Sequence, residues 1–246
     1  MLALIPNSMS LDERAGWAMI RESLERVRER IEAACQRCGR DPSRVKLVAV
    51  TKTVDVERIR EAILSGQRCF GENYVQEALP KINALGPGLE WHFIGHLQTN
   101  KVKHAVGAFH MIQTLDRTPL ARELEKRCQG REPMPVLVQV NVAKEPSKFG
   151  LAKEQLMGFL EELVDIRGIV IKGLMTIPPL CEDPEDARPY FSALRELRDR
   201  MAPFLSPPHS LEELSMGMTS DMEVAIEEGA TMVRVGTAIF GPRPSR

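Results

Sequence analysis

The sequence lacks an excess of either charge and lacks long apolar runs. Lys and Arg together number 33 against 34 Asp and Glu, with no long stretch of one sign, so no basic surface for nucleic acid is predicted. No window approaches the roughly 18 apolar residues that a membrane span needs. The N-terminus has neither the basic start nor the apolar length of a signal peptide. We therefore expect a cytoplasmic protein without nucleic-acid or membrane partners.

Cysteine is also scarce. The chain has five, an odd and scattered set that suits reduced thiols better than a disulfide framework. Cys35 and Cys38 form a C-x-x-C, but they lie in a helical pattern with no second cysteine pair to complete a zinc site. We interpret them as two thiols on one helix face and expect no metal.

Short apolar runs and helical patterns are what the sequence does contain, and they alternate along most of it. Residues 10–38 have the pattern of one charged amphipathic helix that ends at a glycine. Eight strand-like runs follow, each separated from the next by a helical or polar segment. The predicted strands are 45–50, 68–71, 91–95, 109–115, 135–142, 169–177, 211–217 and 232–236.

Alternating strands and helices imply parallel pairing with right-handed crossovers. Eight such units in 246 residues fit a small (β/α)8 TIM barrel. An open doubly wound sheet is the alternative, but its first turn is normally rich in glycine, and the first turn here is TKTVD. We predict one α/β barrel domain over 1–246, with a leading helix at 10–38 and the barrel at 45–240.

Lys52 follows the first predicted strand. Because strand side chains alternate between two faces, Val48, Val50 and Lys52 share one face, and all three point inward if the valines do. A lysine that is partly removed from water at the barrel mouth favours its neutral amine, which attacks aldehydes and ketones to form a Schiff base. The alternative is a lysine that pairs with a carboxylate or extends to water.

The ends of the last two predicted strands suggest an anion site. Ser220 and Glu223 match the S-x-x-E capping box of a helix start, where free N–H groups attract anions. Gly236 and Thr237 can bring backbone N–H groups and a hydroxyl to the same place. Barrels commonly bind phosphate after strands 7 and 8, so we predict a phosphate pocket here. The alternative is that the glycines only make turns.

Arg234 lies within the last predicted strand and needs an acceptor, because an unpaired buried guanidinium is costly. That acceptor could be a nearby glutamate or a heteroaromatic nitrogen. A Schiff-base lysine, a phosphate pocket and this arginine match the aldehyde, the phosphate and the ring nitrogen of pyridoxal 5′-phosphate (PLP).

Several long blocks then resemble a known family. The blocks are "LVAVTKTV", "FGENYVQEALPKI", "WHFIGHLQTNK", "KFGL", "GLMTIPP" and "LSMGMTSDMEVAIEEGATMVRVGTAIFG". Together they resemble the pyridoxal phosphate homeostasis proteins, single-domain relatives of the alanine racemase barrel, over nearly the whole chain. The resemblance implies that Lys52 forms the Schiff base, that Asn73 lies beside the cofactor ring, and that Met175 lines the pocket.

The resemblance also assigns the phosphate and the ring nitrogen. It implies that Ser215 and Met216, with Gly236 and Thr237, hold the phosphate. It implies that Arg234 faces the pyridine nitrogen. An arginine can only donate there, which leaves the nitrogen unprotonated and the cofactor a weaker electron sink, so transaminase and decarboxylase chemistry are disfavoured.

Three functions stay open at this point. The first is a non-catalytic, monomeric PLP carrier in cofactor homeostasis that supplies apo-enzymes. The second is an amino-acid racemase, which needs an acid/base group on each face of the substrate: Lys52 and one of Tyr74 or His92. Racemases of this type take their second base from a further C-terminal domain, and we expect none here. The third is a barrel aldolase that forms its Schiff base on Lys52 with a phosphorylated sugar. His96 is a further candidate acid/base group.

Overall fold

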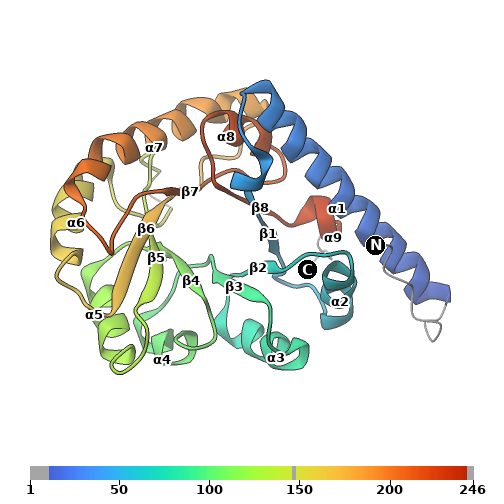
Figure 1. Cartoon of the computed structure of the whole chain (residues 1–246), viewed down its shortest axis with the longest axis horizontal. Helices are drawn as coiled ribbons and strands as arrows, with labels where there is room; N and C mark the ends of the chain where they lie inside the picture. The colour runs from blue at the N-terminus through green and yellow to red at the C-terminus, as the bar shows by residue number, and fades with distance from the viewer. Residues whose placement is uncertain (1–10, 146–147, 243–246) are drawn as a thin grey trace.

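A closed barrel of eight parallel strands forms the centre of the computed structural model, which describes residues 11–145 and 148–242 (Figure 1). Each strand pairs with its neighbour in the sequence, and the last pairs with the first. The prediction of a (β/α)8 barrel with an added N-terminal helix is confirmed. The strands are β1 Lys46–Val50, β2 Cys69–Glu72, β3 Glu90–Phe93, β4 Met111–Leu115, β5 Met134–Gln139, β6 Ile169–Met175, β7 Glu213–Ser215 and β8 Met232–Val235.

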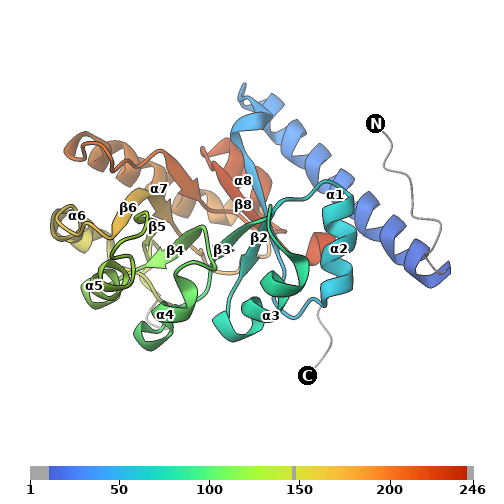
Figure 2. The ribbon, with the colours of Figure 1, turned by 60° about the horizontal axis from the view of Figure 1, so that its bottom comes forward.

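Helices cover the outside of the barrel, and Figure 2 shows α1 beside α2 and α8 along one flank. The helices are α1 Leu11–Arg37, α2 Val56–Leu64, α3 Val75–Leu85, α4 Val102–Ala105, α5 Thr118–Arg127, α6 Leu156–Leu163, α7 Arg188–Met201, α8 Met222–Glu227 and α9 Thr237–Phe240. Short 3-10 turns lie at Pro42–Arg44, Thr99–Lys101, Lys153–Gln155, Pro184–Ala187 and Ala202–Phe204. None of the helices in the described ranges is long and apolar enough to cross a bilayer.

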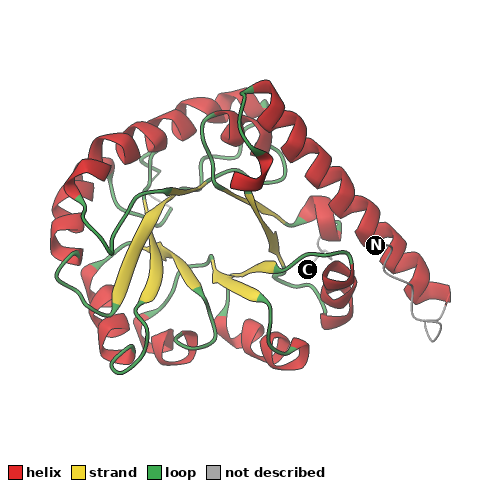
Figure 3. Ribbon diagram, in the orientation of Figure 1, coloured by secondary structure: helices red, strands yellow, loops and turns green. Residues whose placement is uncertain are grey.

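Strand side chains alternate between two separate cores, as the two-residue period requires. The larger core lies between the strands and the surrounding helices (Figure 3). The smaller one fills the barrel interior and consists of Val48, Cys69, Met111, Leu137, Met175 and Met232. Val48 therefore points inward, and the same period carries Val50 and Lys52 toward the barrel mouth, as predicted.

Helix α1 packs across the place where β8 closes on β1. It contacts α2, α8 and α9, and its buried face includes Leu24, Val27 and Ile31. An ion pair also joins α1 to α8, in which Arg30 Nε lies 2.6 Å from Glu223 Oε1.

The start of α8 differs from the predicted capping box. The N-cap is Asp221, not Ser220, and the Asp221 Oδ1 accepts a hydrogen bond of 2.6 Å from the Met218 nitrogen. Glu223 pairs with Arg30 of α1 instead of turning back to cap its own helix. The capping-box prediction is wrong because it considered only partners that are close in the sequence. The Glu223 carboxylate instead forms an ion pair with Arg30 of α1.

A buried charge cluster lies behind the turn that carries Lys52. Lys81 of α3 donates hydrogen bonds of 2.8 Å to Glu72, 2.7 Å to Glu77 and 2.8 Å to the carbonyl oxygen of Thr51. The Thr51 hydroxyl also donates to Glu72, at 2.7 Å. The ammonium thus bridges two carboxylates and ties α3 to the end of β1.

The same cluster holds the next residues of the turn. Thr53 has a φ of 63°, a left-handed conformation that a β-branched residue rarely adopts. Its backbone nitrogen donates a hydrogen bond to Glu77, which is itself bound by Lys81. The position of Lys52 between Thr51 and Thr53 is therefore set on both sides by Lys81 and its carboxylate partners.

Removing the ammonium tests this cluster. Lys81→Met leaves Glu72 buried without its main partner, so we expect the free energy of unfolding at neutral pH to fall by about 3 kcal/mol. Burial already raises the pKa of Glu72, and the hydrogen bond from Lys81 opposes that rise, so the variant's folded pKa is higher still. The folded state then holds the proton more tightly than the unfolded chain, whose glutamate pKa is about 4.3.

The sign of the pH effect follows from this. Protonated Glu72 favours the folded variant at low pH, and that contribution is lost as the pH rises through the folded pKa. Urea denaturation should therefore show a stability loss that is small near pH 4 and large at neutral pH. Lys103→Met, at an exposed lysine of α4, is the matched control and should cost little at any pH. A loss in Lys81→Met that does not change with pH would contradict the account.

Candidate functional site

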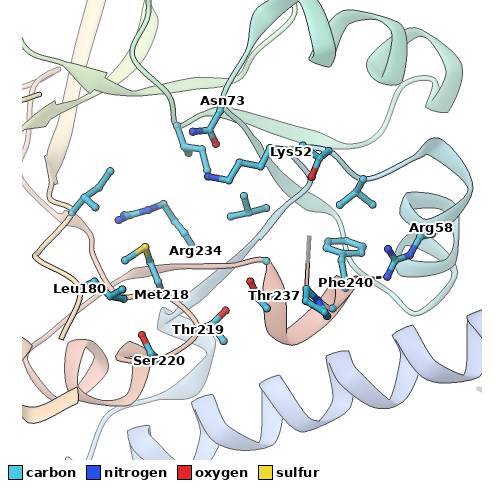
Figure 4. Close-up of a pocket in the computed structure, with 18 residues that line it drawn as sticks. Lys52, Arg58, Asn73, Leu180, Met218, Thr219, Ser220, Arg234, Thr237 and Phe240 are labelled. Atoms are coloured by element: carbon cyan, nitrogen blue, oxygen red, sulfur yellow. Dashed lines mark hydrogen bonds between the residues drawn. The ribbon is translucent and has the colours of Figure 1, made fainter. Parts of the chain in front are cut away.

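A pocket of about 430 Å³ opens at the carboxyl ends of the strands (Figure 4). Its walls come from the loops after β1, β2, β6, β7 and β8, together with the end of β3. Apolar side chains of Val50, Ile94 and Ile177 line it beside several polar groups. This is the place in a (β/α)8 barrel where ligands and substrates bind.

Lys52 enters the pocket from the end of β1 and is half-buried. In Figure 4 its side chain extends across the pocket, so that the amine lies on the same side as Asn73 and Arg234. These three residues come from β1, β2 and β8, which are neighbours around the barrel. The pairing register of β1 with β8 brings Arg234 close to Lys52. Arg234 lies opposite Val48, and Val48 precedes Val50 by two residues and Lys52 by four.

Asn73 brings an unsatisfied acceptor to the pocket. Its Oδ1 is buried and has no hydrogen-bond partner within residues 11–145 and 148–242. Leaving a buried polar atom without a partner costs about 1–3 kcal/mol, so such an atom at a pocket wall indicates that a ligand supplies the missing donor.

Arg234 forms the floor of the pocket and is only 4% exposed. Its Nη1 donates a 2.6 Å hydrogen bond to the Ser215 hydroxyl, and its Nη2 donates a 2.8 Å bond to the carbonyl oxygen of Thr176. Burial lowers the pKa of the guanidinium to about 10, with the charge of Asp221 opposing that shift, so the group is still charged at neutral pH. Its remaining N–H groups are available to a ligand that accepts hydrogen bonds.

Small and hydroxyl residues line the other end of the pocket. Thr219 and Ser220 come from the loop before α8, and Gly236 and Thr237 from the junction of β8 with α9. A Cβ added at Gly236 would lie 3.3 Å from the carbonyl oxygen of Val50, so the two chain segments approach closely there. Hydroxyls beside the unpaired N–H groups of a helix start are typical of a site for an anionic group.

The loop before α8 owes its shape to a second glycine. Gly217 has a φ of 91°, and a Cβ at that position would lie 2.5 Å from the Cβ of Ala225. The chain can therefore turn sharply over α8 directly after β7. This turn directs Met218, Thr219 and Ser220 toward the pocket.

The structure brings together five of the eight residues that the sequence predicts to bind the cofactor. These are Lys52, Asn73, Arg234, Gly236 and Thr237.

The other three predicted residues do not line the pocket. Met175 lies lower, in the apolar interior of the barrel, and Ser215 is buried beneath Arg234, to which it is hydrogen-bonded. Met216 points outward into the core between strands and helices, because it follows inward-facing Ser215 by one residue. The Met216 side chain therefore points away from the pocket, and its predicted contact with the phosphate stays a prediction.

Sequence reasoning missed Met218, Thr219 and Leu180 as pocket residues, whereas Ser220 was part of the predicted anion site and does line the pocket. Thr219 lies shortly after the seventh strand, so a search for hydroxyl residues beyond the strand end could have found it. Leu180 belongs to the long loop after β6, in which no sequence pattern marks a pocket residue.

The candidate acid/base groups lie away from the pocket lining. Tyr74 is 59% exposed at the start of α3. His92 is fully buried, and both of its ring nitrogens have hydrogen-bond partners. His96 stacks on Phe149, with ring centroids 3.8 Å apart, and its pKa is lowered by burial and by the nearby Arg117.

The chain is similar to known proteins over most of its length. Residues 23–244 match the family described as "Alanine racemase, N-terminal domain". The pyridoxal phosphate homeostasis protein of Aquifex aeolicus is 50% identical over 224 residues, which cover 90% of this chain and 97% of that protein. The protein of the same name from Escherichia coli K12 is 42% identical and covers 91% of this chain and 97% of its own length.

Solved structures agree in fold. PipY of Synechococcus elongatus, determined with PLP bound, superposes with a TM-score of 0.78 at 36% identity, covering 90% of this chain and all of PipY (100%). An alanine racemase from Corynebacterium glutamicum has a TM-score of 0.67 at 16% identity and covers 89% of this chain and 62% of that enzyme, a likeness of fold alone. The chain thus belongs to the alanine racemase N-terminal domain family and, within it, to the pyridoxal phosphate homeostasis proteins.

Proposed function

We propose that this protein binds PLP, holds it as a Schiff base on Lys52, and serves cytoplasmic PLP homeostasis by delivering the cofactor to apo-enzymes without catalysis of its own. The observation that carries the proposal is the convergence of Lys52, Arg234 and a hydroxyl-lined end in one pocket. The naming of relatives at 50% and 42% identity as homeostasis proteins, and the PLP in PipY, support the same conclusion.

The residues present fit the chemical groups of PLP. Bound PLP supplies an electrophilic aldehyde, and the Lys52 amine is the nucleophile in the pocket that reacts with aldehydes. Asn73 offers its unpartnered Oδ1 to a donor on the cofactor. Thr219, Ser220 and Thr237 provide hydroxyls for the phosphate.

Arg234 favours a carrier over most PLP-dependent chemistry. A guanidinium whose pKa is about 10 is charged at neutral pH and can only donate a hydrogen bond, so a ring nitrogen that faces it stays unprotonated. An unprotonated ring withdraws electrons weakly from a bound amino acid. Arg234 therefore stabilises the bound cofactor more than it promotes transamination or decarboxylation.

The placement of the acid/base candidates supports the same choice over a racemase. A racemase needs a second group that reaches the substrate from the face opposite the lysine. Tyr74 is exposed outside the pocket lining, and His92 is buried below it with both nitrogens bonded. We propose that the protein acts as a monomer whose open barrel mouth lets the cofactor leave toward an acceptor enzyme.

The Schiff base can be tested by absorption and chemical trapping. The purified protein should be yellow or become yellow when PLP is added, and borohydride should bleach it and leave a pyridoxyl group that peptide mapping assigns to Lys52. Lys52→Ala should abolish the adduct, whereas Lys103→Ala, at an exposed lysine, should not change it. A colourless protein that cannot be reconstituted with PLP would refute the proposal and favour the aldolase alternative.

The phosphate contacts can be separated from those to the ring. Ser220→Ala combined with Thr237→Val removes two hydroxyls from the pocket with little change in volume. We expect PLP to bind on the order of 100-fold more weakly, because each hydrogen bond to a charged group contributes about 1.5 kcal/mol net. Pyridoxal, which has no phosphate, should bind both proteins equally. Equal losses for PLP and pyridoxal would place the phosphate elsewhere.

Delivery and turnover can be compared in one preparation. We expect PLP-loaded protein to restore the activity of an apo-enzyme, and the loaded Lys103→Ala variant, changed at an exposed lysine, to do so as well. We also expect no exchange of α-deuterium in any amino acid that is tested with the loaded protein. Exchange that is lost in Lys52→Ala would instead establish racemase-type catalysis.

A further inference from the structure

A linear network of hydrogen bonds, the file, leads from the pocket floor down through the barrel interior. Arg234 donates to the Ser215 hydroxyl at 2.6 Å, and that hydroxyl donates to Gln113 Oε1 at 2.7 Å. Gln113 Nε2 lies 2.8 Å from His92 Nδ1, and His92 Nε2 lies 2.8 Å from Glu90 Oε1. Four strands, β8, β7, β4 and β3, contribute to this file.

The direction of every bond in the file follows from its first member. A guanidinium can only donate, so the Ser215 hydroxyl accepts from Arg234 and has its own proton left for Gln113 Oε1. The Gln113 amide nitrogen then donates to His92 Nδ1. His92 must therefore carry its proton on Nε2 and donate it to the Glu90 carboxylate.

The lower end of the file is anchored by charge. Lys46 of β1 donates to both oxygens of Glu90, at 2.7 and 3.0 Å. Hydrogen bonds from His92 and Lys46 hold the pKa of Glu90 at about 2, so its carboxylate is ionised at physiological pH. The file thus begins at a cation near the pocket and ends at an anion near the opposite end of the barrel.

The surroundings make the file rigid. Ser215, Gln113 and His92 are each 0% exposed, and the apolar interior side chains of Met111 and Met232 lie in the same space. Hydrogen bonds in such a setting are strong and polarise one another. Burial also lowers the pKa of His92 against the opposing influence of Glu90, so the ring stays neutral as the file requires. Lys46, His110 and the Cys69 thiol are its other charged or titratable neighbours.

Arg234 depends on this file for its orientation. Within the described residues the two hydrogen bonds of its guanidinium go to Ser215 and to the Thr176 carbonyl oxygen, and the guanidinium forms no ion pair with a carboxylate there. The carbonyl is fixed by the backbone. The hydroxyl can rotate, and Gln113 determines which way it points.

We propose that Gln113 and His92 are positioning residues that, through Ser215, orient the Arg234 guanidinium toward the ring nitrogen of the bound cofactor. This inference rests on the proposed function, because it takes PLP as the ligand of the pocket. Neither residue lines the pocket, so their effect on the cofactor is transmitted only through Arg234.

The first experiment uses the ligand-free protein and tests the file itself. Nitrogen-15 NMR of the wild type should show His92 as the neutral tautomer with its proton on Nε2. In Gln113→Leu the Nδ1 signal should move, because that nitrogen loses its donor. A wild-type His92 protonated on Nδ1 would overturn the proposal whether or not PLP binds.

The second experiment uses the PLP-loaded protein. In Gln113→Leu and in Ser215→Ala we expect the visible absorption maximum to shift and PLP to bind about tenfold more weakly, the size of effect that outer partners of a bound group usually have. Borohydride should still trap the cofactor on Lys52. Met111→Leu is the matched control, since it changes the same strand and the same interior without touching the file.

The outcomes separate the two proposals. If Gln113→Leu, Ser215→Ala and Met111→Leu all match the wild type in absorption maximum and affinity, the positioning role is refuted while the function stands. If the wild type itself forms no borohydride-trapped adduct with PLP, the proposed function fails, and the NMR result alone then decides whether the file exists. Should Gln113→Leu not fold, Ser215→Ala removes the same link with a smaller change.

Discussion

The pairing of β8 with β1 is the interaction on which the site depends. Four aligned residue pairs, from Lys46 opposite Met232 to Ala49 opposite Val235, close the barrel and place the end of the chain beside its first strand. Lys52 and Arg234 are far apart in the sequence and become neighbours only through this register. A slip of one residue would turn Arg234 to the opposite face of β8, away from the pocket.

Two buried cations are stabilised in different ways on the two sides of β1. Lys81, outside the barrel wall, is neutralised by the direct contact of Glu72 and Glu77. Arg234, inside the barrel, is held by neutral acceptors. The first arrangement is self-contained and serves to fix a backbone turn. The second leaves the guanidinium able to interact with a ligand, which suits a group at a pocket floor.

The sequence was sufficient to predict the barrel and the face that Lys52 shares with Val48 and Val50, because both depend on periodicity within single segments. Gly236 and Thr237 were predicted from the end of the last strand, Asn73 came from the family resemblance, and all three line the pocket. The outward direction of the Met216 side chain did not emerge from motif matching, which ignores which face of a strand a residue occupies. The hydrogen-bond partners of Gln113 and Glu223 could not be predicted, because they depend on register and packing between elements that are distant in the chain.

Helix α1 gives the barrel a particular order of assembly. Its ion pair between Arg30 and Glu223 joins residues 193 positions apart, and its other contacts include α9, the last helix described. Contacts at such separation form only after a large loss of chain entropy, so they arise late in folding. During synthesis the part of the first helix that packs on α8 and α9 must therefore stay uncovered until those two helices have left the ribosome.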